Sequence, residues 1–256
     1  MCTIAILFQV ADIPLVIAAN RDELYARPTR PPEVLGTALV GGVDELSGGT
    51  WLAVHRAGRF AAVTNQRALA TPPQGLRSRG LAVKELAAAA DQDAYVAALD
   101  PRAYASMNLV WGDADRVCVG YLRRDTGEKT IEVLPPGVHV MCNDRLGSCD
   151  FPRGDRLHAA ITAALARSRA WAELAPVLRT ALADHTRVSL DATPPSHLPR
   201  DIARELTATC IHTERYGTRS STLLAIETGH VAAYLHADGP PCTAPFIDRR
   251  ELLDAA

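Results

Sequence analysis

Hydrophobic residues near the start of the chain occupy both sides of a short extended segment. Residues 3–9 have the sequence TIAILFQ. Successive side chains of a strand point to opposite faces, and here both faces are apolar. A strand of this kind is covered on both faces. The pattern therefore predicts a buried strand at residues 3–9, followed after a short Ala-Asp turn by a second strand at residues 14–19.

The rest of the chain alternates between strand-like blocks and pairs of helical segments. Apolar residues with a helical period predict helices at 78–90, 91–99, 155–168 and 170–184. Helices grouped between hairpin-rich runs indicate antiparallel sheets with helices packed outside, and the doubly apolar first strand indicates two stacked sheets. We therefore expect an α+β fold, and a single domain over residues 1–256, since no linker divides the chain. The other predicted strands are 38–43, 50–56, 59–64, 107–112, 116–122, 130–134, 138–141, 208–213, 220–227 and 230–235.

Composition and charge narrow the class of protein. The chain has 256 residues, of which 48% are hydrophobic and 22% charged, as is typical of a globular protein. Its formal net charge of -2 gives no reason to expect nucleic acid as a partner. No apolar run approaches the roughly 20 residues of a membrane-spanning helix, and no basic region precedes the N-terminal apolar stretch. We expect a cytoplasmic protein without a membrane span.

The cysteines show no pattern of a metal site. The chain has 6 cysteines and no CxxC pair. Cys210 and His212 lie two residues apart, so on a strand they would face the same way. A second pair of ligands at zinc spacing is missing. The sequence therefore predicts neither a metal site nor a disulfide framework.

Common catalytic and cofactor motifs are absent as well. The chain has no P-loop, and its Gly-Gly pairs at residues 41–42 and 48–49 lack the GxGxxG spacing of a dinucleotide site. It has neither a GxSxG elbow nor an HExxH helix. We expect no cofactor, and the serine and zinc hydrolase templates do not apply.

Cys2 is the most informative single residue, and it has two interpretations. It can be a small hydrophobic residue at the start of a buried strand. Alternatively, removal of Met1 would leave Cys2 with a free α-amino group, whose reference pKa of about 7.7–8.0 suits a base near neutral pH. The thiol, with a pKa near 8.5, needs only modest help to ionise. Nucleophile and base would then belong to one residue.

Polar residues at strand ends can complete such a site. Arg21 and Asp22 follow the second strand, and an antiparallel hairpin places them beside Cys2, although these residues can equally form a solvated turn. A guanidinium and a carboxylate can fix the charge state of an amine and a thiolate. Asn65 and Asn143 each follow a strand and can supply amide donors to an oxyanion.

Four sequence blocks together resemble the NRDE family, which includes the eukaryotic transport-and-Golgi-organization proteins. They are MCTIAILF, AANRDELYARPT, DELSGGTWLAVHRAGRFAAVTNQR and RYGTRSSTLLAI, and they span nearly the whole chain. The resemblance implies the αββα four-layer sandwich of the N-terminal nucleophile hydrolases. Within that superfamily the chain looks most similar to the cysteine enzymes related to bile-salt hydrolases and penicillin acylases, which cleave amide bonds.

This resemblance also implies roles for individual residues. Cys2 would be the nucleophile, with Asp22 holding its amine and Arg21 supporting the thiolate. Asn65 and Asn143 match the asparagines that bind the oxyanion or the amine.

Further positions follow from the same blocks. Arg219 is the best candidate for an arginine on a late strand of the site, and Arg215 is the second candidate. The substrate is expected to contact Asn20, Glu23 and Trp51. The segment MCNDRLGSCDFPRG departs from the family pattern, because a cysteine precedes Asn143 and no tryptophan follows, so the pocket wall is expected to differ.

Two functions remain open at this point. The first is a cysteine N-terminal nucleophile hydrolase that cleaves a non-peptide amide bond of a small molecule. The alternative is a non-catalytic carrier or chaperone of a hydrophobic ligand, such as haem or an acyl or lipid group. Haem would need an axial ligand in an apolar pocket, and His139, Cys142 and Cys149 are the options. The sequence predicts no oligomeric state.

Overall fold

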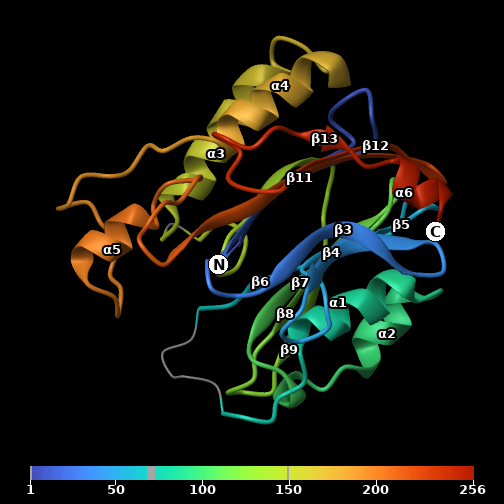
Figure 1. Cartoon of the computed structure of the whole chain (residues 1–256), viewed down its shortest axis with the longest axis horizontal. Coiled ribbons are helices and arrows are strands. Elements are labelled where there is room, and N and C mark those ends of the chain that lie inside the picture. Colours follow the sequence, from blue (N-terminus) through green and yellow to red (C-terminus); the bar gives the residue numbers. More distant parts are fainter. Residues whose placement is uncertain (1, 68–72, 149) are drawn as a thin grey trace.

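Two antiparallel β-sheets lie face to face in the computed structural model, which describes residues 2–67, 73–148 and 150–256 (Figure 1). The six-stranded sheet has the order β10 (Gly137–Met141), β1 (Cys2–Phe8), β2 (Leu15–Leu24), β11 (Tyr216–Glu227), β12 (His230–Ala237) and β13 (Ile247–Asp248). The seven-stranded sheet runs in sequence order through β3 (Thr29–Gly36), β4 (Leu39–Asp44), β5 (Leu52–His55), β6 (Phe60–Asn65), β7 (Met107–Gly112), β8 (Val117–Leu122) and β9 (Lys129–Val133).

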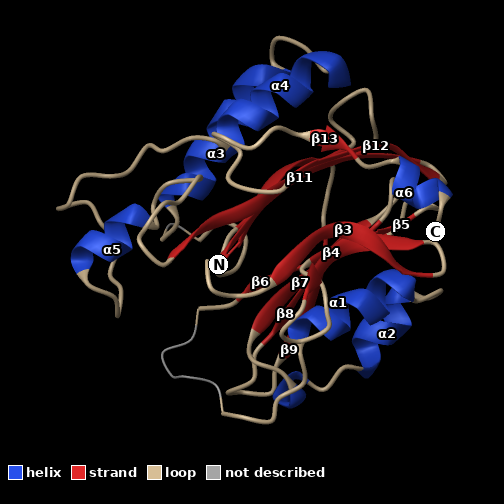
Figure 2. Cartoon of the chain, viewed as in Figure 1, coloured by secondary structure: helices blue, strands red, loops and turns tan. Residues whose placement is uncertain are grey.

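Helices cover the outer face of each sheet (Figure 2). The pair α3 (Pro152–Leu165) and α4 (Trp171–Leu182) packs on the six-stranded sheet. The pair α1 (Arg79–Ala88) and α2 (Gln92–Ala98) packs on the seven-stranded sheet. This arrangement confirms the expected αββα sandwich. The remaining helical segments are short: η1 (Pro101–Ala103), α5 (Arg200–Glu205) and α6 (Glu251–Asp254).

The first strand has the two apolar faces that its sequence predicts. Ile4 and Ile6 lie in the core between the sheets, whereas Ala5 and Leu7 lie in the core between the six-stranded sheet and α3 and α4. All four side chains are buried. Burial of a large aliphatic side chain contributes about 1.5–3 kcal/mol, so β1 anchors two of the layer interfaces at once.

The second strand is longer than the sequence pattern indicates. β2 continues to Leu24 and includes Asn20, Arg21, Asp22 and Glu23, which the apolar pattern alone places after the strand. It pairs with β11 along almost its whole length, with an irregularity between Thr218 and Ser220. The NRDE tetrapeptide is therefore strand rather than turn, and its side chains alternate between the two faces of the sheet.

Two further predictions about secondary structure are wrong. β3 was missed because two prolines interrupt its sequence; as an edge strand it tolerates them, with a register shift between Arg30 and Glu33. Residues 208–213 form no strand. Their backbone bonds to other partners instead: the Cys210 N–H donates to the Asp184 carbonyl at 2.9 Å, and the Thr209 carbonyl accepts from the side chain of Asn20 at 3.0 Å.

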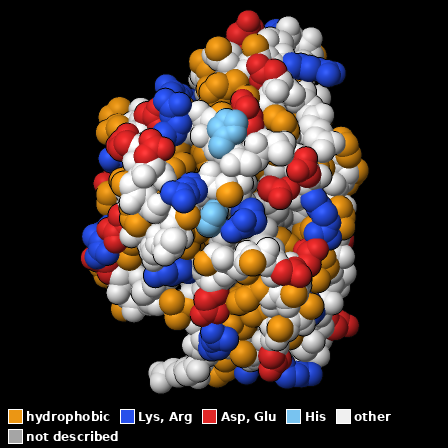
Figure 3. All heavy atoms as spheres, turned by 90° about the vertical axis from the view of Figure 1, so that its right-hand side faces the viewer, with side chains coloured by type: hydrophobic (Ala, Val, Ile, Leu, Met, Phe, Trp, Pro, Cys, Tyr) orange, Lys and Arg blue, Asp and Glu red, His pale blue; other side chains and the backbone are white. Residues whose placement is uncertain are grey.

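The surface mixes charges of both signs. On the face shown in Figure 3, basic and acidic side chains are interspersed with apolar ones, and no field of a single sign stands out. This mixture agrees with the small net charge of -2. No helix in the described part of the chain is long and apolar enough to cross a bilayer.

Candidate functional site

Cys2 and Arg21 are paired directly across β1 and β2. Side chains that are directly opposite in an antiparallel pair lie on the same face. On this face, Ile4 and its partner Ala19 belong to the core between the sheets. Cys2 and Arg21 therefore face the space between the two sheets, at the end where that core stops.

A cavity of about 410 Å³ opens at this position. Its walls come from β2, the β4–β5 connection, the end of β6 and the start of α1. Most of the residues expected at the site meet here. Those that line the cavity are Cys2, Arg21, Asp22, Glu23, Trp51 and Asn65.

Glycines bring the loop that carries Trp51 against its neighbours. A Cβ atom at Gly42 would lie 2.1 Å from the Trp51 ring, so only glycine leaves room for the indole. A Cβ atom at Gly49 would lie 2.3 Å from the backbone of Gly80, at the start of α1. The Thr50 N–H also donates to the Gly80 carbonyl at 3.0 Å. The SGGTW segment is thus fixed as one wall of the cavity.

Arg21 is held by stacking more than by ion pairing. Its side chain is 5% exposed, and the guanidinium carbon lies 4.4 Å from the centre of the Trp51 ring, a favourable cation–π distance. Glu23 is 4.0 Å away. The buried Nη1 atom of Arg21 makes no hydrogen bond to a described residue. A stacked, incompletely bonded guanidinium beside a thiol can receive an anion.

The thiol of Cys2 is not ionised by its surroundings alone. Burial raises its pKa, and the charge of Asp22 raises it further, whereas Arg21 and a hydrogen bond from the backbone N–H of Asp22 lower it. The net direction is upward. Activation of the sulfur near neutral pH therefore requires a base.

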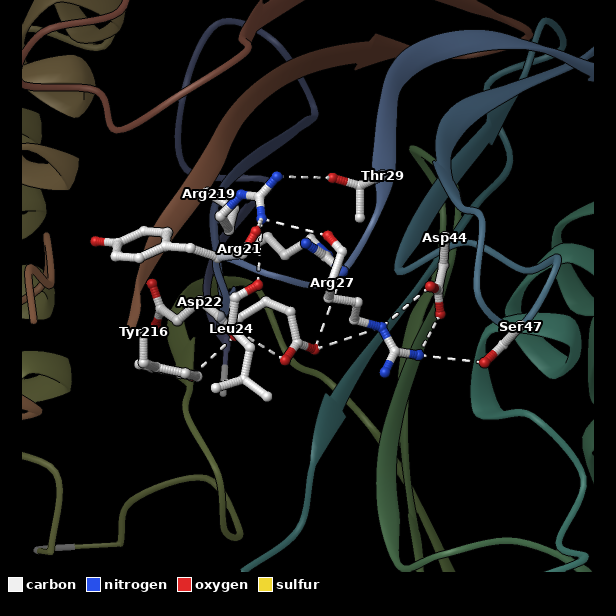
Figure 4. A network of polar contacts seen from close by, with 11 residues as sticks. Arg21, Asp22, Leu24, Arg27, Thr29, Asp44, Ser47, Tyr216 and Arg219 are labelled. Atoms are coloured by element: carbon white, nitrogen blue, oxygen red, sulfur yellow. Dashed lines mark hydrogen bonds and ion pairs between the residues drawn. The ribbon is translucent and has the colours of Figure 1, made fainter. Parts of the chain in front are cut away.

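Asp22 lies on the opposite face of β2 from Arg21, as strand alternation dictates. Its side chain is 1% exposed and accepts a hydrogen bond from the Thr218 hydroxyl at 2.7 Å. The Tyr216 hydroxyl donates to its backbone carbonyl at 2.8 Å (Figure 4). Burial raises the pKa of the Asp22 carboxyl, while Arg153 and the bond from Thr218 oppose that rise.

Asn65 and Asn143 are neighbours, as expected, but they are bonded differently. The Asn143 side chain donates to the backbone carbonyl of Asn65 at 2.8 Å and accepts from Arg153 at 2.9 Å. The Asn65 side-chain amide has no hydrogen bond within the described part of the chain. Asn143 is thus a buried link, whereas Asn65 lines the cavity with an amide available to a ligand.

Arg153 is a buried residue that our sequence analysis missed. It is the second residue of α3, is 1% exposed, and also donates to the Leu206 carbonyl at 2.7 Å. Its charge lowers the pKa of Asp22. A sequence signal existed, because Arg153 precedes Leu157 and Ile161 at intervals of four and therefore lies on their buried helix face.

Two expected site residues lie away from the cavity. The Asn20 side chain donates to the carbonyls of Leu182 and Thr209 at 2.9 and 3.0 Å, because it shares the face of Asp22, toward α4. Arg219 donates to the Leu24 and Tyr25 carbonyls at 3.2 and 2.6 Å (Figure 4).

The expected contact of Asn20 with substrate and the expected place of Arg219 in the site therefore need correction. Arg219 instead fastens the corner between β2 and β3, where it also reaches the hydroxyl of Thr29 at 3.3 Å. The second candidate, Arg215, does not line the cavity either.

A smaller apolar pocket lies on the other side of the two asparagines. Its volume is about 190 Å³, and Asn65 belongs to the walls of both cavities. Its apolar walls are Phe151, Pro152, Pro194, Pro195, Leu198, Ala203 and Leu206.

The residues considered for haem are less suitable. His139 and Cys142 line a space of about 220 Å³, below the roughly 300–1,000 Å³ of ligand pockets. The His139 Nε2 atom is also 2.8 Å from the Pro135 carbonyl. Cys149 lies outside the described residues. Among the described residues, no cluster of three or more metal-ligating side chains lies on the Cys2 cavity.

The fold is that of an N-terminal nucleophile hydrolase-like protein. A cysteine-to-alanine mutant of conjugated bile acid hydrolase from Clostridium perfringens matches with a TM-score of 0.54 over 97% of this chain and 96% of that one, at 10% sequence identity. An arginine-to-leucine variant of that hydrolase matches with a TM-score of 0.51, also at 10% identity, with the same coverage of 97% and 96%. At this identity the likeness concerns the fold alone.

The chain belongs to the Transport and Golgi organisation 2 family, whose model matches residues 1–236. The Transport and Golgi organization protein 2 homolog of Bos taurus is 30% identical over 236 residues, covering 85% of this chain and 84% of the relative. The Homo sapiens homolog is 28% identical over 239 residues, with the same coverage of 85% and 84%. The family expected from the four sequence blocks is therefore confirmed.

Proposed function

We propose that this protein is a cysteine N-terminal nucleophile hydrolase that cleaves a non-peptide amide bond of a small molecule. The observation that carries the proposal is the pairing of Cys2 with Arg21 on the wall of a cavity between the sheets. Asp22 is the next residue of the same strand, and its backbone N–H and its charge both act on the Cys2 thiol. Three residues, Cys2, Arg21 and Asp22, therefore offer a nucleophile, a cation and a carboxylate at a single strand end.

In the proposed reaction, removal of Met1 makes Cys2 the first residue. Its α-amino group accepts the thiol proton, and the thiolate attacks the amide carbonyl carbon. The carbonyl oxygen becomes an oxyanion, to which the Asn65 amide donates. The ammonium group then gives its proton to the amide nitrogen, the C–N bond breaks and the amine leaves. A thioester on Cys2 remains.

Water completes the cycle. The α-amino group accepts a proton from water, whose oxygen attacks the thioester carbon, and the C–S bond breaks. The acid is released and the sulfur recovers its proton through the amine. Arg21 stabilises the thiolate in both halves, and Asp22, fixed by Thr218 at 2.7 Å, orients the ammonium form.

The charges around the cavity favour a substrate with an anionic group. Arg21, Arg27, Arg77 and Arg79 line it. Arg27 is neutralised by Asp44 at 2.6 Å and Arg77 contacts Glu85 at 3.2 Å.

Arg79 differs from these paired arginines. It forms no ion pair with a described residue, and its best contact is the Ser106 carbonyl at 3.4 Å. It also begins α1, where the helix dipole favours a negative charge. Arg79 would therefore bind a carboxylate or similar group of the substrate.

The apolar pocket beside Asn65 supports the carrier function as a second candidate. Its volume of about 190 Å³ suits a short apolar chain and not a haem. A carrier would need this pocket but not the chemistry of Cys2. The two functions therefore respond differently to substitution of the cysteine.

The test is intact mass spectrometry before and after incubation with an electrophilic acyl probe. We expect native protein without Met1 and one acyl adduct, which is absent in Cys2→Ala and retained in Cys118→Ala. Cys118 is a matched control because it is fully buried in the seven-stranded sheet. Turnover of an amide substrate should fall by several orders of magnitude in Cys2→Ala, and Cys2→Ser should also be impaired.

Two results would contradict the proposal. If native protein retains Met1, the proposed base is a peptide nitrogen and the mechanism is wrong. If Cys2→Ala folds, is acylated like wild type and binds apolar ligands within severalfold of wild type, Cys2 is only a strand residue and the carrier function is favoured.

A further inference from the structure

Four metal-ligating side chains converge at a place remote from the Cys2 cavity. One ligand atom from each of His185, Cys210, His212 and Cys242 lies within 4.8 Å of all the others. The Cys210 and Cys242 sulfurs are 3.8 Å apart. The His212 Nε2 atom is 3.6 Å from the Cys210 sulfur and 3.3 Å from that of Cys242.

These side chains come from three separate segments. His185 follows α4, Cys210 and His212 precede β11, and Cys242 follows β12. This explains why spacing in the sequence did not reveal the cluster, since Cys210 and His212 form only half of it. Convergence of two thiols and two imidazoles from three segments has no evident role in core packing, because all but Cys210 are exposed.

The geometry resembles that of a tetrahedral zinc site. With Zn–S distances near 2.3 Å and Zn–N distances near 2.0–2.1 Å, ligand atoms of a tetrahedral site lie roughly 3.3–3.8 Å apart. The three separations among the ligand atoms of Cys210, His212 and Cys242 fall in this range at 3.3, 3.6 and 3.8 Å. Thiolate and imidazole ligands together suit Zn²⁺ rather than a hard cation.

The backbone also prepares His185 as a ligand. Its Nδ1 atom is 3.1 Å from the Cys210 carbonyl, which can only accept a hydrogen bond. This contact places the ring proton on Nδ1 and leaves the lone pair of Nε2 available for a metal. The Cys210 N–H in turn donates to the Asp184 carbonyl at 2.9 Å, so the segments that carry His185 and Cys210 are already joined.

We propose that His185, Cys210, His212 and Cys242 bind one Zn²⁺ ion in a structural site. Four protein ligands fill a tetrahedral shell and leave no position for a substrate. Such an ion would fasten the Cys242 loop to the segment before β11.

The fastened segment leads directly to the NRDE strand. Ile211, the residue between Cys210 and His212, is joined to Thr218 by two hydrogen bonds. The Ile211 N–H donates to the Thr218 hydroxyl at 2.9 Å, and the Thr218 N–H donates to the Ile211 carbonyl at 2.9 Å. The same hydroxyl donates to Asp22 at 2.7 Å. The zinc site would therefore stabilise the support of Asp22. The proposal itself does not depend on catalysis at Cys2.

The test is elemental analysis of untagged full-length protein after gel filtration, combined with Co²⁺ reconstitution. We expect about one zinc ion per chain. Protein stripped by a chelator and given Co²⁺ should show thiolate-to-cobalt charge transfer and the intense visible bands of tetrahedral cobalt. Stripping should also lower the thermal midpoint, because the ion binds the folded chain.

Substitutions at the exposed ligands His185 and Cys242 test metal binding with little risk of unfolding the protein, because neither side chain is buried. Cys242→Ala and His185→Ala should each weaken zinc binding by more than about 100-fold, beyond the usual cost of losing an outer-shell partner. Cys118→Ala and His230→Ala are matched controls outside the cluster and should retain the metal. The proposal is overturned if stripped wild type takes up no stoichiometric Zn²⁺ or Co²⁺, if the ligand variants bind as wild type does, or if native protein contains a Cys210–Cys242 disulfide.

Discussion

Cys2 and Arg21 are partners in one antiparallel pair, and both point into the space between the sheets. This register decides to which face of the sheet each side chain of the NRDE tetrapeptide points. Arg21 and Glu23 share the face of Cys2, whereas Asn20 and Asp22 face α3 and α4. A slip of one residue would exchange the two sets. The long ladder between β2 and β11 fixes the register on the other side.

Replacement of Arg21 should reduce the fraction of Cys2 that is present as thiolate. Arg21 lowers the pKa of this thiol against the upward effect of burial, so Arg21→Gln should raise that pKa further. The thiolate fraction near neutral pH then falls, and alkylation by iodoacetamide should slow by up to about tenfold for each unit of pKa. The measurement is the alkylation rate of Cys2 as a function of pH.

Arg27→Gln is the control for this experiment. Arg27 lines the same cavity but pairs with Asp44 at 2.6 Å, and it is not among the causes of the Cys2 shift. Equal alkylation profiles for Arg21→Gln and Arg27→Gln would mean that the guanidinium of Arg21 does not act on the sulfur.

The two asparagines should separate catalysis from stability. Asn65→Ala removes a cavity amide without a hydrogen bond to the described protein, so acylation should fall about 10²–10³-fold with little change in the free energy of unfolding. Asn143→Ala removes the acceptor of Arg153, at 2.9 Å, and should lower the unfolding free energy by about 1–3 kcal/mol. Chemical denaturation and single-turnover acylation measure the two effects. The opposite result would be an Asn143→Ala variant that folds stably but is not acylated, together with an Asn65→Ala variant that is acylated normally. Asn143 would then be the oxyanion donor, and Asn65 would not.

Arg219 should act by positioning the corner between β2 and β3. Arg219→Ala removes donors to the carbonyls of Leu24 and Tyr25, so amide hydrogen exchange in residues 24–29 should become faster and acylation slower. Arg215→Ala is the control, because only its backbone carbonyl contacts Tyr25, at 2.9 Å. If Arg219→Ala instead raises KM while exchange is unchanged, Arg219 contacts substrate and its proposed positioning role is wrong.

The sequence predicted the layers because burial leaves a periodic signal. The doubly apolar residues 3–9 indicated two sheets, and the helical periods after residues 78 and 155 placed the outer layers. β3 was not predicted because its prolines are tolerated only at the edge of a sheet, and a local sequence pattern does not show which strand lies at an edge. Residues 208–213 have strand-like composition, but the Thr209 carbonyl accepts a hydrogen bond from the side chain of Asn20 instead of from a neighbouring strand.

Residues of the candidate site could be predicted where a motif or a strand end marked them. Cys2, Arg21 and Asn65 meet at the cavity for that reason. Arg153 was missed because a charged residue on a helix normally faces solvent, and only its spacing with Leu157 indicated burial. His185 and Cys242 lie far in sequence from their spatial neighbours. Their convergence depends on how the six-stranded sheet packs with its helices and loops, which no local sequence pattern predicts.

His236 should make the protein less stable in mild acid. It is 1% exposed on β12, and burial, with help from Arg249, lowers its pKa to about 3. The unfolded value is near 6.5, so between these values the unfolded chain binds a proton that the folded chain does not. Its contribution is complete above pH 6.5 and should fall by about 2 kcal/mol by pH 5. Denaturation of His236→Gln should show a smaller loss over this interval than wild type, and His230→Gln, altered at an exposed histidine of the same strand, should match wild type. Parallel stability curves for all three proteins would show that His236 titrates normally.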